Sequence, residues 1–107
     1  SKGLDGCLTL YSEEQWQLRV ANINELPDSQ TQYIRRNLYA TTEQVTPDKQ
    51  GRILISPTLR RHAGLVKDVT VIGVGTTAEI WDSERWNAFN ESMSSEQLLN
   101  DMKALNI

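Results

Sequence analysis

Apolar residues along the chain recur either at the spacing of an α-helix or in the alternation of a β-strand. In the first helical segment, Trp16, Val20 and Ile23 share one face behind a capping Ser12, and Pro27 ends the segment. An amphipathic helix is therefore predicted there. Capping residues, breakers and the same spacing predict further helices over residues 28–40, 57–64, about 83–92 and 94–107.

Two of these helices carry apolar stripes that need a partner surface. In the second helix, Ile34 and Leu38 are expected to be buried, while Arg35 and Arg36 lie toward another face. The C-terminal helix has a single stripe, formed by Leu98, Met102 and Leu105. This tail is expected to need a surface on which to pack.

Shorter segments alternate with a period of two and predict strands. A turn at Asp5 and Gly6 leads into a strand that runs to residue 11. Residues 41–47 and 52–56 flank a turn and are expected to form a hairpin. A second hairpin is predicted from residues 68–75 and 76–82, which are rich in Val, Ile and Thr and meet at glycines.

One stretch of the sequence occurs twice. CLTLYSEEQW, residues 7–16, aligns without gaps with TAEIWDSERW, residues 77–86, so that strand, aromatic, cap, acid and Trp recur in register. This indicates a tandem duplication in which the first copy lacks its front half. We expect the first strand to pair with the second copy or with another chain. The domains predicted are the rest of the first repeat (1–40), the second repeat (41–92) and a C-terminal amphipathic helix (93–107).

Composition restricts the class of protein. At 107 residues, with 38% hydrophobic and 23% charged residues, the chain is expected to form one folded unit. Its apolar runs are too short to cross a bilayer, and its start does not resemble a signal peptide. Cys7 is the single cysteine, so a reducing, cytoplasmic setting is expected.

Charge is distributed unevenly along the chain. The net charge is −3, yet residues 33–67 hold seven basic residues against two acidic ones. A basic centre can bind an anion locally, because phosphate contact depends on the field at one face more than on total charge. An unevenly charged, solvated surface explains the same pattern equally well.

An enzyme is not expected. His62 is the single histidine, so a nucleophile and base pair would require it to meet Cys7, and no catalytic or phosphate-loop motif accompanies them. Cys7 is interpreted as a small buried residue and His62 as a cation at a helix end or a surface side chain. No catalytic residue, metal ligand or cofactor is predicted.

The sequence resembles the MraZ family of bacterial transcription regulators. The resemblance is carried by DKQGRILISP, which fits the family's D-x-x-x-R motif as Asp48 and Arg52, by LRRHAGL, by GLDGCLTLY and by EIWDSERW, and it covers about residues 3–92. It implies an α+β fold, the AbrB-like split β-barrel built from a tandem duplication, with flanking helices. The family's first D-x-x-x-R turn would precede GLDGCLTLY, and the sequence begins after that position.

The resemblance assigns DNA contacts to the basic residues around this turn. Arg52 and Lys49 would contact DNA, since Arg can bridge two acceptors of guanine or bind a phosphate. Alternatively, Arg52 pairs with Asp48 and staples the turn, in which Asp48 and Gly51 are structural. The further candidates for phosphate contact, on the helix that follows, are Arg60 and Arg61, which are equally consistent with a solvated helix face.

Two functions remain open on the sequence alone. The first is a sequence-specific DNA-binding regulator, which the resemblance implies reads repeated promoter boxes of the division and cell-wall gene cluster as a ring-like homo-oligomer in the cytoplasm and nucleoid. The second is a protein-interaction or assembly module that uses the C-terminal helix to bind a protein partner. No membrane partner is expected.

Overall fold

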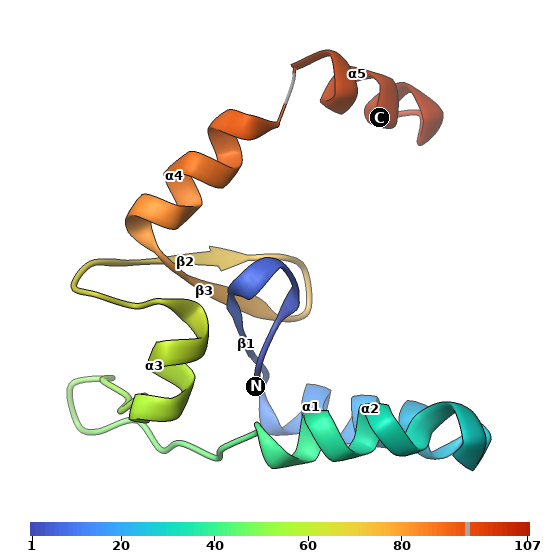
Figure 1. The fold of residues 1–107 in the computed structure, drawn as a ribbon, viewed down its shortest axis with the longest axis vertical. Helices are drawn as coiled ribbons and strands as arrows, with labels where there is room; N and C mark the ends of the chain where they lie inside the picture. The colour runs from blue at the N-terminus through green and yellow to red at the C-terminus, as the bar shows by residue number, and fades with distance from the viewer. Residues whose placement is uncertain (94) are drawn as a thin grey trace.

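A three-stranded antiparallel sheet lies at the centre of the fold (Figure 1). In the computed structural model, which describes residues 1–93 and 95–107, the strands are β1 (Leu8–Leu10), β2 (Val69–Gly73) and β3 (Ala78–Asp82), in the order β1-β3-β2. The predicted hairpin of β2 and β3 is therefore confirmed. The first strand pairs with β3, one of the two arrangements expected for it. Helices surround this sheet, which confirms the α+β class.

The pairing of β1 with β3 has a local two-fold character. Its register joins Leu8 to Ile80, Thr9 to Glu79 and Leu10 to Ala78. Thr9 and Glu79 occupy matching positions in the two similar sequence segments, and here they face each other at the centre of the ladder. Two segments that resemble each other in sequence thus meet strand against strand, in opposite directions.

A similar edge-to-face contact between two aromatic rings occurs at the end of each of these two strands. Tyr11 meets Trp16 edge to face at 5.5 Å with an interplanar angle of 63°, and Trp81 meets Trp86 at 5.3 Å and 62°. Phe89 extends the second cluster by packing 5.0 Å from Trp81. These ring contacts join each strand to the helix that follows it, and Trp16 also meets Tyr39 of another helix at 6.2 Å.

The helices begin and end close to where the capping residues predicted. They are α1 (Glu13–Asn24), α2 (Asp28–Ala40), α3 (Pro57–Ala63), α4 (Ser83–Ser92) and α5 (Ser95–Ala104). Ser12, Ser56 and Asp82 each accept a hydrogen bond from the backbone N–H three residues later, which satisfies a donor that the helix leaves unpaired. Ser94, the first residue of the predicted C-terminal segment, lies outside the described residues.

The predicted hairpin of residues 41–47 and 52–56 was wrong. The turn forms, with the Asp48 N–H bonded to the Arg52 carbonyl at 2.8 Å, but neither arm is a strand. A β-ladder needs alternating bonds along both arms, and among the described residues these arms pair with no strand. The β-prone residues of the two arms are therefore held as extended chain on either side of a turn.

The buried face of α2 also differs from the prediction. Ile34 is 46% exposed, whereas Thr31 is fully buried and its hydroxyl donates to the Pro27 carbonyl at 3.1 Å. Leu38, also predicted to be buried, is partly so. Since α2 packs mainly against α1, its contact face is narrow and centred on Thr31.

The core is small and joins residues from distant parts of the sequence. Its buried centre consists of Leu8, Leu59, Ala63 and Ile80, against which Ile55 and Leu65 pack. Gly64 ends α3 in the left-handed region at φ 61°, as predicted, and so turns the chain back toward this core. Because Ile55 packs against this buried centre, one end of the segment that carries the Asp48–Arg52 turn is held on the core.

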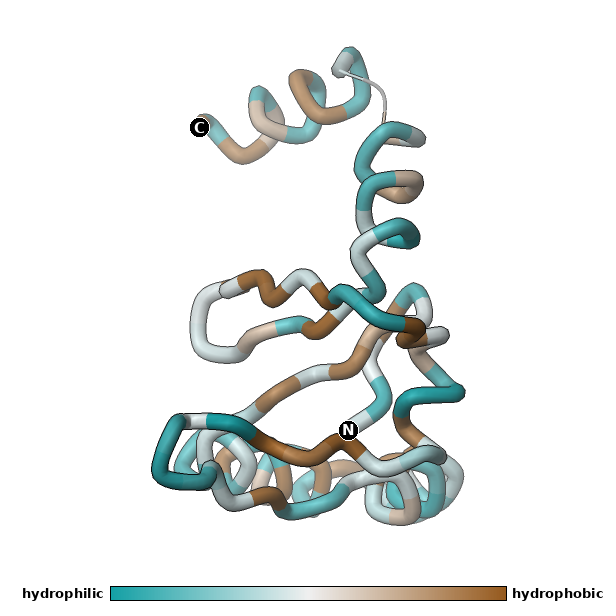
Figure 2. The backbone as a smooth tube through the Cα atoms, turned by 90° about the vertical axis from the view of Figure 1, so that its left-hand side faces the viewer, coloured by the Kyte–Doolittle hydropathy of each residue, from teal (hydrophilic) through white to brown (hydrophobic). Residues whose placement is uncertain are grey.

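The overall shape is open. The radius of gyration is 16.0 Å, compared with about 13 Å for a compact domain of this length. Figures 1 and 2 show α5 standing apart from the sheet, with hydrophobic and hydrophilic positions interspersed along it. The stripe predicted on this helix, Leu98, Met102 and Leu105, is accordingly exposed. Across residues 1–93 and 95–107, each helix is too short or too polar to cross a membrane.

Candidate nucleic-acid interface

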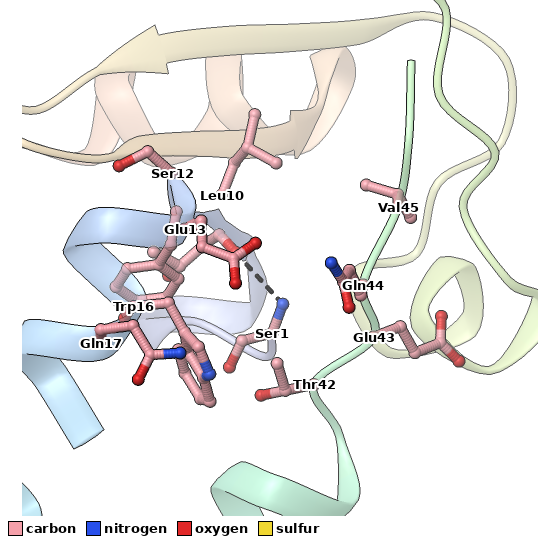
Figure 3. Close-up of a pocket in the computed structure, with 12 residues that line it drawn as sticks. Ser1, Leu10, Ser12, Glu13, Trp16, Gln17, Thr42, Glu43, Gln44 and Val45 are labelled. Carbon is pink, nitrogen blue, oxygen red and sulfur yellow. Dashed lines mark hydrogen bonds between the residues drawn. The ribbon is translucent and has the colours of Figure 1, made fainter. Parts of the chain in front are cut away.

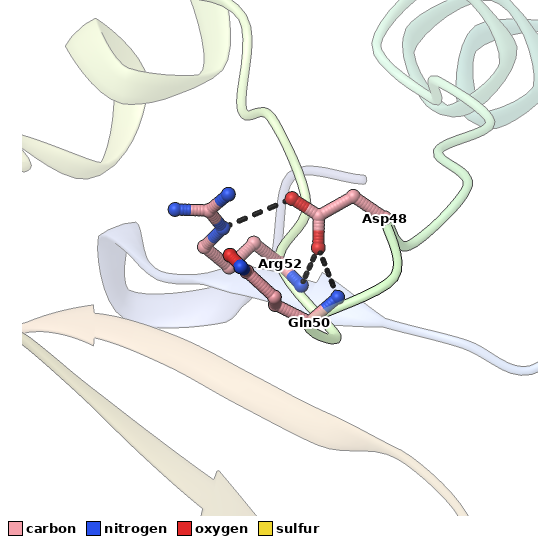
Figure 4. A network of polar contacts seen from close by, with 3 residues as sticks. All are labelled: Asp48, Gln50 and Arg52. Atoms are coloured by element: carbon pink, nitrogen blue, oxygen red, sulfur yellow. Dashed lines mark hydrogen bonds and ion pairs between the residues drawn. The ribbon is translucent and has the colours of Figure 1, made fainter.

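The turn from Asp48 to Arg52 is built around one carboxylate (Figure 4). Asp48 Oδ1 accepts hydrogen bonds from the backbone N–H groups of Gln50 and Arg52, both at 2.9 Å. The backbone closes the same turn, because the Gly51 N–H donates to the Asp48 carbonyl at 3.0 Å. Gly51 takes a φ of 78°, a conformation that L side chains rarely adopt. Asp48 thus accepts two backbone hydrogen bonds within the turn, and Gly51 supplies its positive φ.

Arg52 is paired on one side only. Its Nε donates to Asp48 Oδ2 at 2.9 Å, so the alternative in which the two residues staple the turn describes a contact that exists. Figure 4 shows one terminal nitrogen of the guanidinium on the side away from Asp48, and the side chain is 74% exposed. Within residues 1–93 and 95–107, Nη1 and Nη2 have no hydrogen-bond partner. The ion pair and a free donor fork therefore coexist in one side chain.

The carboxylate is held in its charged form. Hydrogen bonding from the Arg52 backbone N–H, with smaller contributions from Gln50 and the Arg52 side chain, lowers the pKa of Asp48 below its ordinary value. Asp48 is thus ionised across the neutral range. The contact with Arg52 Nε is consequently an ion pair across the neutral range.

The other predicted DNA-binding residues are exposed cations near this turn in sequence. Lys49 lies within the turn itself and its side chain is exposed. Arg60 and Arg61 lie in the last turn of α3, where cations face the negative end of the helix. Arg61 makes one long contact, 3.5 Å from Nη2 to Thr58 Oγ1. Among the described residues, no hydrogen bond or ion pair joins these two arginines to Arg52.

Arg85 is an important side chain that sequence analysis missed. From α4, its Nη1 donates to the Ala63 carbonyl at 2.6 Å and to the Gly6 carbonyl at 3.3 Å. It thereby ties the end of α3 to the turn before β1. No local pattern indicates this contact, because Arg85 and Gly6 lie 79 residues apart in the sequence.

A polar hollow near the sheet lies between β1, α1 and the segment after α2 (Figure 3). It has a volume of about 270 Å³, and its walls include Trp16, Glu13 and Glu43. Two carboxylates and an indole would suit a cation better than an anion. This hollow is therefore not a candidate phosphate site.

The two residues considered for nucleophilic chemistry do not form a pair. Cys7 is fully buried and donates to the Leu4 carbonyl at 3.0 Å, and its burial, with the nearby Glu79 carboxylate, raises the pKa of the thiol to about 11. His62 is partly buried, and desolvation followed by the charges of Lys2 and Arg85 lowers its pKa. The lowered pKa favours the neutral imidazole over the helix-end cation, which was one of the two roles expected of His62 in the last turn of α3.

Metal binding finds no support in the described residues. Across 1–93 and 95–107, no group of three or more His, Cys, Asp or Glu side chains could hold a metal ion. The chemistry available at the surface is hydrogen bonding and ion pairing by exposed cations. Such groups can bind an anionic polymer without any covalent step.

Comparison with known proteins places these features in context. The family model "MraZ protein, putative antitoxin-like" matches residues 38–105. Three similar proteins are each named transcriptional regulator MraZ. The protein from Acetivibrio thermocellus is 43% identical, over 100% of this chain and 78% of its own length. Those from Heliobacterium modesticaldum and Lachnoclostridium phytofermentans are 42% and 45% identical, over 85% and 80% of this chain and 65% and 62% of their own lengths.

Proposed function

Because the chain belongs to the MraZ family, we propose that it regulates transcription by binding DNA through the turn from Asp48 to Arg52. The relatives are named as transcriptional regulators and not as enzymes, in agreement with the sequence analysis. The observation that carries the proposal is the guanidinium of Arg52, whose terminal nitrogens face solvent from a rigid turn. A cation fixed in this way is suited to nucleic acid.

The remaining cations extend the proposed interface. Lys49 stands on the same turn and supplies a point charge for phosphate. Arg60 and Arg61, exposed on α3, would contribute further phosphate contacts. In this arrangement, Arg52 supplies sequence preference and the other three supply affinity that depends on salt.

We propose further that several copies act together on repeated promoter boxes. One turn offers few contacts, whereas several identical turns in one homo-oligomer make the later contacts intramolecular and raise avidity. The apolar surface supports such an assembly, since Val69, Val71 and Val74 are exposed along and beyond β2, at the edge of the sheet. In full, the proposed assembly is a ring of AbrB-like split barrels. It would bind the promoter of the division and cell-wall gene cluster, in the cytoplasm and nucleoid.

The test is a salt titration of DNA binding by fluorescence anisotropy. A labelled duplex from that promoter is bound by the wild type, Arg52→Ala and the control Arg36→Ala, which removes an exposed cation from α2. Arg52→Ala should fold normally and lose about 1 to 3 kcal/mol per contacted site. The control should retain its affinity. Wild-type affinity in folded Arg52→Ala would reject the site, and absence of any binding by the wild type would reject the function.

A second function is favoured by one observation, the exposed stripe of α5. Leu98, Leu99, Met102 and Leu105 leave this helix with a largely uncovered apolar face. As an interaction module, the chain would bind a protein partner through that face and would not bind DNA. The titration above separates the two, because a protein module gives no salt-dependent DNA binding.

A further inference from the structure

We infer that Asp48 determines specificity, by restricting Arg52 to end-on recognition of a base edge that carries two neighbouring acceptors. This inference rests on the proposed function. It gives the Asp48 carboxylate a part in DNA recognition in addition to its hydrogen bonds within the turn. Its basis is the way in which the two oxygens of Asp48 are divided between backbone and side chain. One oxygen shapes the turn and the other holds the guanidinium.

The contact made by Nε limits how Arg52 can bind a ligand. A guanidinium has five N–H donors and can grip a pair of acceptors side-on, through Nε and one terminal nitrogen, or end-on, through both terminal nitrogens. Nε is already committed to Asp48 Oδ2 at 2.9 Å. The end-on fork of Nη1 and Nη2 is the edge that remains without a hydrogen-bond partner in the described chain.

The orientation of this fork is fixed by the backbone. Asp48 Oδ1 is held by the N–H groups of Gln50 and Arg52, so the carboxylate cannot rotate without breaking two hydrogen bonds. The carboxylate in turn restricts the orientation of the guanidinium through its contact with Nε. A planar fork in a fixed orientation matches the O6 and N7 acceptors of guanine in the major groove, whereas a mobile arginine would serve equally well on any phosphate.

The charge of Asp48 acts in the opposite direction on non-specific binding. A carboxylate beside the reading residue repels phosphates, so it weakens any contact that depends only on charge. The inference therefore predicts effects of opposite sign on specific and non-specific DNA when the charge is removed. A residue that only maintained the turn would change both in the same direction.

The variant Asp48→Asn separates the two functions of the carboxylate. The amide oxygen that remains can still accept from the backbone N–H groups of Gln50 and Arg52 and keep the turn. The amide nitrogen replaces the oxygen that faces Arg52 Nε, and a donor cannot accept that hydrogen bond. Lys49→Gln is the matched control, because it removes one charge from the same turn and leaves these contacts in place.

The experiment starts from a pool of randomised DNA duplexes. The wild type selects an enriched set, and binding of that set and of the input pool is then measured for each protein. Asp48→Asn should bind the enriched set about tenfold more weakly and the input pool as well or better, while Lys49→Gln should weaken both. If Asp48→Asn lost the same affinity for both pools, or kept the wild-type preference for the enriched set, the inferred role of Asp48 would be rejected and the proposed function would stand. If the wild type enriches nothing, both the inference and the proposed function are rejected.

Discussion

Replacing Arg85 with alanine is expected to lower the free energy of unfolding by about 2 kcal/mol, although the residue lies outside the buried core. Its Nη1 joins α4 to the Ala63 carbonyl at the end of α3 and to the Gly6 carbonyl in the turn before β1. Loss of the side chain leaves the Ala63 carbonyl without its charged donor. The connection between three separate segments is lost at the same time.

The magnitude follows from the two hydrogen bonds. A hydrogen bond with a charged partner contributes about 1.5 to 3 kcal/mol, and a cation at a helix C-terminus adds about 0.3 to 1 kcal/mol. The contact with Ala63 at 2.6 Å is short, whereas that with Gly6 at 3.3 Å is long and exposed, so it contributes less. Because part of the side chain is in solvent, which screens the charge, the lower half of this range applies.

Urea denaturation at matched protein concentration measures the effect, with Arg60→Ala as the control because that arginine is exposed on α3. Arg85→Lys keeps the charge but not the fork, and it should fall between the wild type and Arg85→Ala. The control should lie within about 0.5 kcal/mol of the wild type. A change of that small size in Arg85→Ala would refute the reasoning and leave Arg85 as a solvated cation.

Three further predictions concern single side chains. The pKa of His62 is lowered below its usual 6.5, so the folded protein should lose stability as the pH falls below 6.5, where the unfolded chain binds a proton more readily. Denaturation midpoints measured across this pH range should show the loss, and the variant His62→Gln should no longer show it. The pKa of Cys7 is raised from 9.0 to about 11, so stability should fall as the pH rises between these values, and at pH 8 a thiol reagent should label the native protein far more slowly than the unfolded chain; equal labelling rates would contradict its burial. Gly51→Ala should cost about 1 kcal/mol because φ is 78° there, whereas Gly73→Ala, at a glycine without positive φ and with open space around it, should cost much less, as paired thermal melts can check.

Local signals in the sequence were sufficient for most element boundaries. Ser12 was recognised as a cap, and a helix was expected to end at Gly64, because each acts on backbone groups within four residues of itself. The turn around Asp48 was recognised for the same reason. Contacts of this range depend little on the remainder of the fold.

Features that depend on distant partners were not predictable. The arms beside the turn have β-prone residues, but a strand also requires a neighbour, and in the described chain these arms have none. Ile34 lies on a helical stripe, yet α2 turns Thr31 inward instead. For the candidate site, the sequence identified Arg52 and its pairing with Asp48 but could not specify that Nε makes the contact and leaves the fork free.

The meeting of β1 and β3 at Thr9 and Glu79 bears on how the chain can be divided. Because each similar segment places its strand against the other, a cut between residues 40 and 48 would give two fragments that each present an unsatisfied strand. Neither fragment would hold a closed core, since Leu8 would be on one and Ile80 on the other. The halves of the sequence are therefore not halves of the fold, and mixing the two fragments would be expected to restore structure by complementation.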